Sequence, residues 1–243
     1  MKIIRIVLFG SICFSLAGQK LLAQGANLNN NNVVGWNNPP SSLAKENVSY
    51  SDVKGDCYWN PQWLRARVTT KNGEVYNIPK AKLNLYSEEI HYMNDEGLER
   101  AIKNGVNTVV FYSRIDTSRI GVFKSIKGLP VSDKDSDIKA KEVYTQILAE
   151  GKIRFLKLTV IKLIQREGDA MTRTLEWNFE PRESYFIEEN YNIQPLGSIS
   201  KDHLFALVKK TDGDEEWLKS NKNKLKKEMD VIAFLNYRNS LAK

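Results

Sequence analysis

The chain has 243 residues, a formal net charge of +7 and two cysteines, Cys13 and Cys57. A chain of this size can build a hydrophobic core without disulfide bonds. Without the N-terminal segment described next the net charge is +4, a surplus too small to steer a partner strongly, and we exclude nucleic acid as a partner.

Residues 1–23 have the layout of a secretory signal peptide. Lys2 and Arg5 give a positive start, and the apolar stretch at 6–16 is too short to span a bilayer as a helix. Cleavage is expected after Ala23, or alternatively after Ala17. Removal of this segment takes away three positive charges and no acid, which lowers the net charge from +7 to +4.

Cleavage also removes Cys13 and leaves Cys57 without an intramolecular partner. Cys13 follows Ile12 rather than a small residue, so no lipid anchor is expected. Secreted eukaryotic domains usually use disulfides, and one remaining cysteine therefore indicates a bacterial envelope, either the periplasm or the outer-membrane-associated or extracellular side. We expect Cys57 to be buried, and pairing with another chain is the alternative.

Residues 24–52 are rich in Asn, Pro and Ser and show no apolar period, so we expect a flexible tail. Residues 53–243 are expected to form a single strand-rich domain. Its first clear strand lies at 64–69, where apolar and polar residues alternate. Asn72-Gly73 predicts a tight hairpin turn, and Pro79 predicts a bulge or edge just before the next strand, at 80–85.

Further strands are predicted at 90–93, 106–112 and 120–126, and then at 143–149 and 175–179. Residues 153–163 suit either a strand or one face of a helix, and the preceding Glu150-Gly151 turn favours a strand. From 198 to 243 the apolar period becomes helical. Ser200, Asp214 and Asn223 mark the expected starts of three helices. The predicted fold class is α+β, mainly β: an antiparallel strand meander closed by two or three C-terminal helices.

The segment from Cys57 to Trp63 carries an aromatic cluster. Exposed rings at Tyr58, Trp59 and Trp63 would stack on a sugar or a peptide, and these three residues are the candidate ligand-binding site. The interpretation that we favour is structural: Trp59 and Trp63 plug one end of the sheet, since large aromatic side chains dominate core burial.

Other candidate sites lack the pattern that their chemistry needs. The carboxylates of Asp133, Asp135 and Asp137 have calcium-loop spacing, but the required Gly and Glu positions of an EF-hand hold other residues. His91 and His203 each stand alone, without the close ligand pairs of a zinc module or the motif of a nucleophilic enzyme. We therefore assign no catalytic residue, metal or cofactor.

Several short motifs resemble uncharacterised exported proteins of Bacteroidetes-type bacteria. They are Tyr58-Trp59-Asn60, the Asn72-Gly73 hairpin, Lys82-Leu83-Asn84-Leu85-Tyr86 and Leu235-Asn236-Tyr237-Arg238-Asn239. The resemblance implies a compartment and a lineage, and it brings no activity with it.

The leading hypothesis is an exported bacterial envelope protein that is not an enzyme and that binds or scaffolds an envelope protein or a glycan. The alternative is a carbohydrate- or peptide-binding module that uses the exposed aromatic side chains. An enzyme is the third and least favoured hypothesis. No transmembrane span is expected.

Overall fold

The computed structural model describes residues 52–102, 105–131, 136–168 and 175–241. The expected signal peptide, the expected tail up to residue 51, and Asp133 and Asp135 of the acidic loop lie outside the described residues. Within these ranges no helix is long and apolar enough to cross a membrane.

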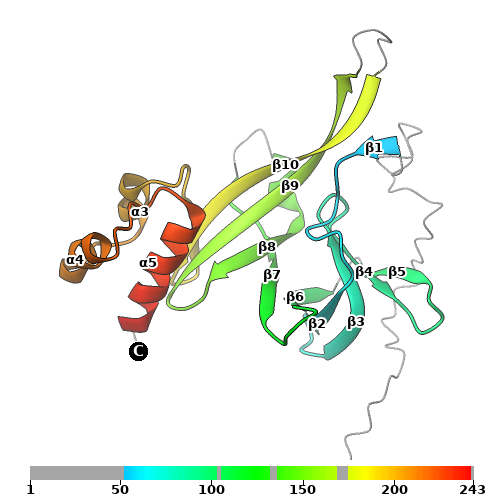
Figure 1. The fold of residues 1–243 in the computed structure, drawn as a ribbon, viewed down its shortest axis with the longest axis horizontal. Coiled ribbons are helices and arrows are strands. Elements are labelled where there is room, and N and C mark those ends of the chain that lie inside the picture. The colour runs from blue at the N-terminus through cyan, green and yellow to red at the C-terminus, as the bar shows by residue number, and fades with distance from the viewer. Residues whose placement is uncertain (1–51, 103–104, 132–135, 169–174, 242–243) are drawn as a thin grey trace, which may run out of the picture.

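Strands dominate the described chain (Figure 1). The strands are β1 (Val53–Lys54), β2 (Leu64–Thr70), β3 (Val75–Asn84), β4 (Glu89–Met93), β5 (Glu99–Ile102), β6 (Val106–Tyr112), β7 (Arg119–Lys127), β8 (Glu142–Ala149), β9 (Ile153–Glu167), β10 (Leu175–Glu189) and β11 (Asn192–Pro195). The helices are α2 (Ser136–Ala140), α3 (Lys201–Leu207), α4 (Asp212–Ser220) and α5 (Glu228–Leu241).

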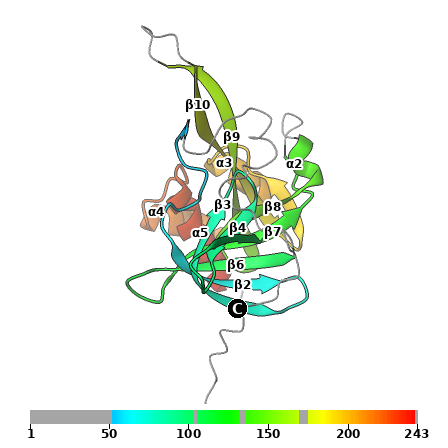
Figure 2. The same cartoon turned by 90° about the vertical axis from the view of Figure 1, so that its right-hand side faces the viewer.

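The strands form one sheet with the order β1-β10-β9-β8-β7-β6-β2-β3-β4-β5, while β11 pairs with β10. The mainly β fold with C-terminal helices is as predicted, but the simple meander is not. Two antiparallel runs, β2 to β5 and β6 to β10, join where β6 pairs with β2, and β1 lies parallel to β10. Figure 2 shows β2, β6, β7 and β8 side by side.

Alternating burial explains why β2 could be predicted. In β2 the side chains of Leu64, Ala66 and Val68 are buried while Arg65 and Arg67 are exposed. The register between β2 and β3 shifts beside Pro79, which confirms the predicted bulge, although β3 begins before that proline and not after it. Residues 153–163 belong to β9, so the strand alternative was correct.

The sheet curves so strongly that its distant strands share one core. The largest cluster of buried side chains combines Phe111 of β6 and Phe123 of β7 with Phe179 of β10. Tyr86, in the turn between β3 and β4, packs against Phe179 with ring centroids 5.2 Å apart. The β3–β4 turn therefore reaches across the concave side of the sheet toward β8 and β10.

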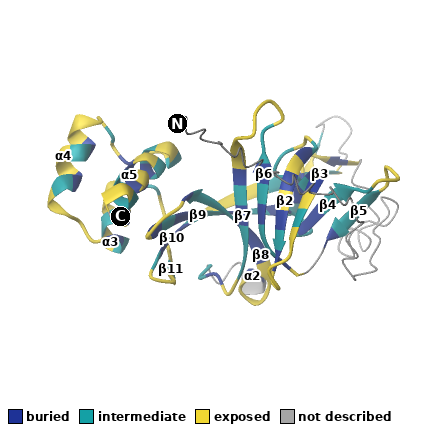
Figure 3. Ribbon diagram, turned by 90° about the horizontal axis from the view of Figure 1, so that it is seen from below, coloured by how far each residue is buried: buried dark blue, intermediate teal, exposed yellow. Residues whose placement is uncertain are grey.

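Helices α3, α4 and α5 lie at the end of the long β9–β10 hairpin that contains Ile153 and Ile187 (Figure 1). Their apolar faces pack on Phe155 and Ile187 and enclose Phe234 of α5. Figure 3 shows the exposed faces of α3, α4 and α5 turned outward, while buried residues run along β2, β6 and β7. Ser200 caps α3 as predicted, and its hydroxyl accepts the His203 N–H at 3.3 Å.

The predicted start of the third helix at Asn223 was wrong. Leu225 adopts a left-handed backbone with φ of 51° and buries its side chain completely. The helix therefore begins at Glu228. Asp230 fixes this start, since its carboxylate accepts the N–H groups of Lys226 and Lys227 at 3.0 and 3.2 Å.

Candidate functional site

The aromatic segment runs beside the C-terminal end of β3. The Trp59 N–H donates to Leu83 O at 2.9 Å, and the Leu85 N–H donates to Cys57 O at 2.8 Å. Extended backbone sends successive side chains to opposite faces. Tyr58 accordingly contacts His91 and Lys82. Trp59 instead contacts the core rings of Phe111 and Phe123. Cys57 is buried, as expected, and this burial raises the pKa of its thiol to about 12.

Trp59 packs at the end of the core. Its ring centroid lies 5.4 Å from that of Phe111 and 5.0 Å from that of Phe123. A Cβ built on Gly121 would lie only 2.5 Å from the Trp59 ring, so the absence of a side chain at Gly121 makes room for the indole. Trp59 therefore makes the core contacts that we favoured for it from the sequence.

Gly121→Ala is expected to lower the free energy of unfolding by about 1 to 3 kcal/mol, because the added methyl group overpacks a rigid ring. Urea denaturation followed by circular dichroism measures the change. The double variant Gly121→Ala with Trp59→Phe should recover part of the loss, because the smaller ring leaves space. Equal destabilisation by both variants would contradict this packing.

Tyr58 and Trp63 meet on the outer face around one lysine. The Lys82 ammonium lies 4.8 Å from the centroid of the Tyr58 ring and 4.7 Å from that of the Trp63 ring. At these distances a cation is attracted to the face of each ring. Of the three candidate ligand-binding residues, Tyr58 and Trp63 therefore lie together beside Lys82, whereas Trp59 packs in the core.

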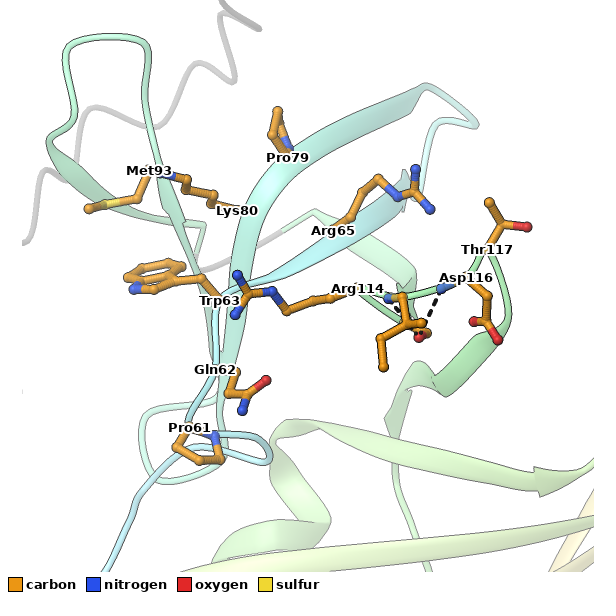
Figure 4. A pocket seen from close by; sticks show the side chains of 12 residues that line it. Pro61, Gln62, Trp63, Arg65, Pro79, Lys80, Met93, Arg114, Asp116 and Thr117 are labelled. Carbon is orange, nitrogen blue, oxygen red and sulfur yellow. Dashed lines mark hydrogen bonds between the residues drawn. The ribbon is translucent and has the colours of Figure 1, made fainter.

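Trp63 lines an open groove of about 770 Å³ formed by the loop before β2, strands β2 and β3, the end of β4 and the β6–β7 loop (Figure 4). We call it the Trp63 groove. The described residues that line it are Pro61, Gln62, Trp63, Arg65, Pro79, Lys80, Met93, Ser113, Arg114, Ile115, Asp116 and Thr117.

Positive charge dominates this groove. Arg65, Lys80 and Arg114 line it, and none of the three is in an ion pair with another residue in the part of the chain that the structure describes. Arg65 instead lies over the Tyr112 ring, 5.6 Å from the centroid. Asp116 is the acid among the described lining residues, and hydrogen bonds from Ser118 lower its pKa.

His91 lies beside this face between two glutamates. Its Nδ1 is 2.6 Å from Glu99 Oε1 and 3.2 Å from the Tyr58 hydroxyl, and its Nε2 is 3.4 Å from Glu89 Oε2. Burial by itself would lower the pKa of His91, but its hydrogen bonds to the carboxylates of Glu89 and Glu99 outweigh burial and raise it. His91 also contacts the Tyr58 ring edge-on, with ring centroids 5.5 Å apart, so it links Tyr58 to the two glutamates.

His203, the second histidine considered in the sequence, lies outside the cluster of His91, Glu89 and Glu99. His203 is exposed in the first turn of α3, with Nδ1 2.8 Å from the Ser198 hydroxyl. Across the described ranges, no group of three or more His, Cys, Asp and Glu side chains is arranged to hold a metal ion.

A second cavity, of about 540 Å³, opens between the β3–β4 turn and β8. We call it the Glu88 cavity. Glu88 has a left-handed backbone with φ of 56°, and its Oε2 accepts the Tyr144 N–H at 2.8 Å. Desolvation raises the pKa of Glu88 to about 8. Glu142 lines the same cavity, where hydrogen bonds from Lys71 and Ser125 lower its pKa.

The sequence analysis missed the groove cations and the Glu88–Glu142 pair. The outward positions of Arg65 and Lys80 could have been read from the strand alternation, because both neighbour buried residues. Arg114 follows β6 in a loop, and nothing local in the sequence links it to Trp63.

Comparison with protein-family models, with curated proteins and with solved structures found no match for this chain.

Proposed function

We propose that this chain is an exported bacterial envelope protein, of the Bacteroidetes type, that binds an acidic glycan in the Trp63 groove. The observation that carries the proposal is the pairing of a half-exposed indole with three cations around one concave surface. A sugar ring stacks on a flat aromatic side chain, and guanidinium groups bind carboxylates with two parallel hydrogen bonds.

The charge of the groove favours an acidic ligand over a neutral one. Arg65, Lys80 and Arg114 outnumber Asp116 among the described lining residues. Arginine is well suited to this task because it stays charged and presents a planar fork of donors. Lys82, which lies over both Tyr58 and Trp63, extends the positive surface along the outer face.

A glycan suits the groove better than an extended peptide. Peptides that bind to sheets usually add a strand and use main-chain hydrogen bonds along a free edge. Pro61 and Pro79 both line the groove, and neither has an N–H to donate. Recognition at this surface must therefore come mainly from side chains, through the ring of Trp63 and the charged groups around it.

Trp63→Ala is expected to weaken binding of an oligogalacturonide, a glycan with one carboxylate per sugar, by at least about tenfold. Such a loss corresponds to about 1.4 kcal/mol, within the range of a stacking contact between a ring and a flat face. Isothermal titration calorimetry on the chain without residues 1–23 measures the affinity. Tyr191→Ala, which removes an exposed aromatic ring from the β10–β11 turn, is the matched control and should leave the affinity unchanged.

A neutral oligosaccharide of equal length should bind more weakly, and added salt should weaken binding of the acidic one. Equal affinity for both glycans, or no binding of either, would contradict the proposal.

A further inference from the structure

Positive charge gathers where α4 leads into α5, at the helical end of the molecule (Figure 1). We call residues 219–227 the lysine loop. Five of its nine residues are lysines, and all five are exposed: Lys219, Lys222, Lys224, Lys226 and Lys227. None of the five is in an ion pair with another residue of the chain that the structure describes.

The backbone of the lysine loop is held in one shape. Leu225 is completely buried and has a left-handed backbone, as has Lys222 with φ of 50°. The Asn223 N–H donates to Leu218 O at 2.9 Å, and its side-chain amide donates to Asp230 O at 2.8 Å. Left-handed backbone in residues other than glycine persists only where the surroundings hold it. The loop therefore keeps its lysines together on a fixed frame, although like charges repel one another.

The acids that flank the lysine loop bind other groups. Glu228 lies 3.0 Å from the Lys157 ammonium of β9, and Glu215 is in ion pairs with two lysines that precede α4. Asp230 accepts two backbone N–H groups of the loop. Glu216 in the middle of α4 is exposed. Even if Asp230 and Glu216 each offset one lysine, three of the five positive charges remain.

An exposed apolar side chain stands beside these lysines. Met229, in the first turn of α5, is 68% exposed and adjoins Asp230, whose carboxylate binds the loop backbone. The exposed residues that the structure describes in α5 are all uncharged: Met229, Ala233, Asn236, Ser240 and Leu241. A soluble polyanion would leave Met229 in water. The surface of a bilayer accommodates both groups, with ammonium groups at the phosphates and an apolar side chain just below them.

We propose that the lysine loop and Met229 dock the protein on the surface of an anionic phospholipid bilayer. The ammonium groups contact the lipid phosphates, and each lysine near such a surface strengthens binding about fivefold. Met229 enters the headgroup region. The Trp63 groove, which β2, β3 and β4 help to form, lies toward the opposite end of the molecule from α4 (Figure 3). Docking therefore leaves the groove open, and the proposal is independent of what the groove binds.

Cosedimentation of the chain without residues 1–23 with lipid vesicles tests the proposal. Vesicles made of equal parts phosphatidylglycerol and phosphatidylcholine should bind the protein far more tightly than vesicles of phosphatidylcholine alone. Removing three charges should lower the partition coefficient on the anionic vesicles by about 100-fold. The variant that does so combines Lys222→Gln, Lys224→Gln and Lys226→Gln.

A matched control removes the same charge from exposed positions on the sheet and should bind the vesicles nearly as wild type does, because salt screens distant charges. It combines Arg67→Gln, Lys127→Gln and Arg182→Gln. Met229→Ser should weaken binding by a smaller factor than the lysine variant. Circular dichroism of each variant checks that the fold is kept.

Three results would overturn the proposal: no preference of wild type for the anionic vesicles, equal binding by the lysine variant and the control, or unchanged binding by Met229→Ser. Calorimetry with oligogalacturonide on the same samples separates these outcomes from failure of the Trp63 groove. The lysine variant should keep the glycan affinity, and Trp63→Ala should lose it while still binding the vesicles. A lysine variant that loses glycan affinity but keeps vesicle binding would assign the loop to the glycan instead.

Discussion

Replacing Asp214 by alanine is expected to lower the free energy of unfolding by about 3 to 5 kcal/mol, because it leaves a buried charge without its partner. The Asp214 side chain is fully buried, and its Oδ2 lies 2.6 Å from Nη1 of Arg238, which is only 13% exposed. The same oxygen accepts the Thr211 N–H at 2.7 Å, which completes the capping box of α4. One carboxylate thus fixes α4 and joins it to α5.

Urea denaturation followed by circular dichroism measures this loss. Asp212→Ala, an exposed acid in the same first turn, is the matched control and should change stability by less than about 0.5 kcal/mol. The double variant Asp214→Leu with Arg238→Met should recover part of the loss, since apolar side chains can replace a buried ion pair. Similar changes in the free energy of unfolding for Asp214→Ala and Asp212→Ala would show that the Asp214–Arg238 ion pair contributes little to stability.

Glu88→Gln is expected to stabilise the protein relative to wild type increasingly as the pH rises. The pKa of Glu88 is about 8 in the folded protein against an ordinary value of 4.5, and burial is the main cause. The folded state therefore holds a proton that the unfolded state has released between about pH 4.5 and 8. Wild-type stability falls across this window and is level above it.

Glutamine keeps the acceptor for the Tyr144 N–H and has no proton to lose, so the variant should lack this decline. One pKa unit is worth 1.36 kcal/mol, and water entering the open cavity reduces the full effect, so we expect a gain of about 2 to 4 kcal/mol at pH 9 relative to pH 4. Denaturation at several pH values measures the difference, with Glu96→Gln as the control for loss of one carboxylate. If the stability difference between Glu88→Gln and wild type did not change with pH, Glu88 would be shown to be well solvated in the folded protein.

The clearest strand prediction rests on alternating burial, as in β2, where buried Leu64, Ala66 and Val68 are separated by exposed or half-buried residues. In β6 the signal is the apolar composition, with Val106, Val109 and Phe111 buried. The middle of β10 carries no such signal, because residues 181–184 are all exposed and are held by pairing with β9. β5 is four residues long and carries two charged residues, so local pattern could not reveal it.

Only part of each site could be predicted, because the rest depends on contacts between distant segments. Tyr58, Trp59 and Trp63 could be selected from the sequence as aromatic residues, but only the structure shows that Trp59 packs on Phe111 and Phe123 instead. The pKa of Glu88 depends on burial by the curved sheet, and its fixed position depends on Tyr144, 56 residues away.

A similar long-range contact fixes the C-terminal motif. Asn239 of α5 accepts the Ile153 N–H at 2.9 Å and donates to the carbonyl groups of Glu150 and Ile153 at 3.1 and 2.8 Å. Asn239 thereby holds the β8–β9 turn. Its side chain fills the space next to Gly151, so any side chain at position 151 would collide with it. The sequence showed the motif but not this structural role.

Titration of the ¹⁵N-labelled chain without residues 1–23 with oligogalacturonide tests most directly whether Trp63 lines a binding surface for an acidic glycan. Each indole N–H gives its own signal, assigned by single Trp→Phe variants. We predict a saturable shift of the Trp63 signal, while the signals of Trp59 in the core and Trp217 between the helices stay in place. An unmoved Trp63 signal at ligand concentrations that saturate binding would contradict the account.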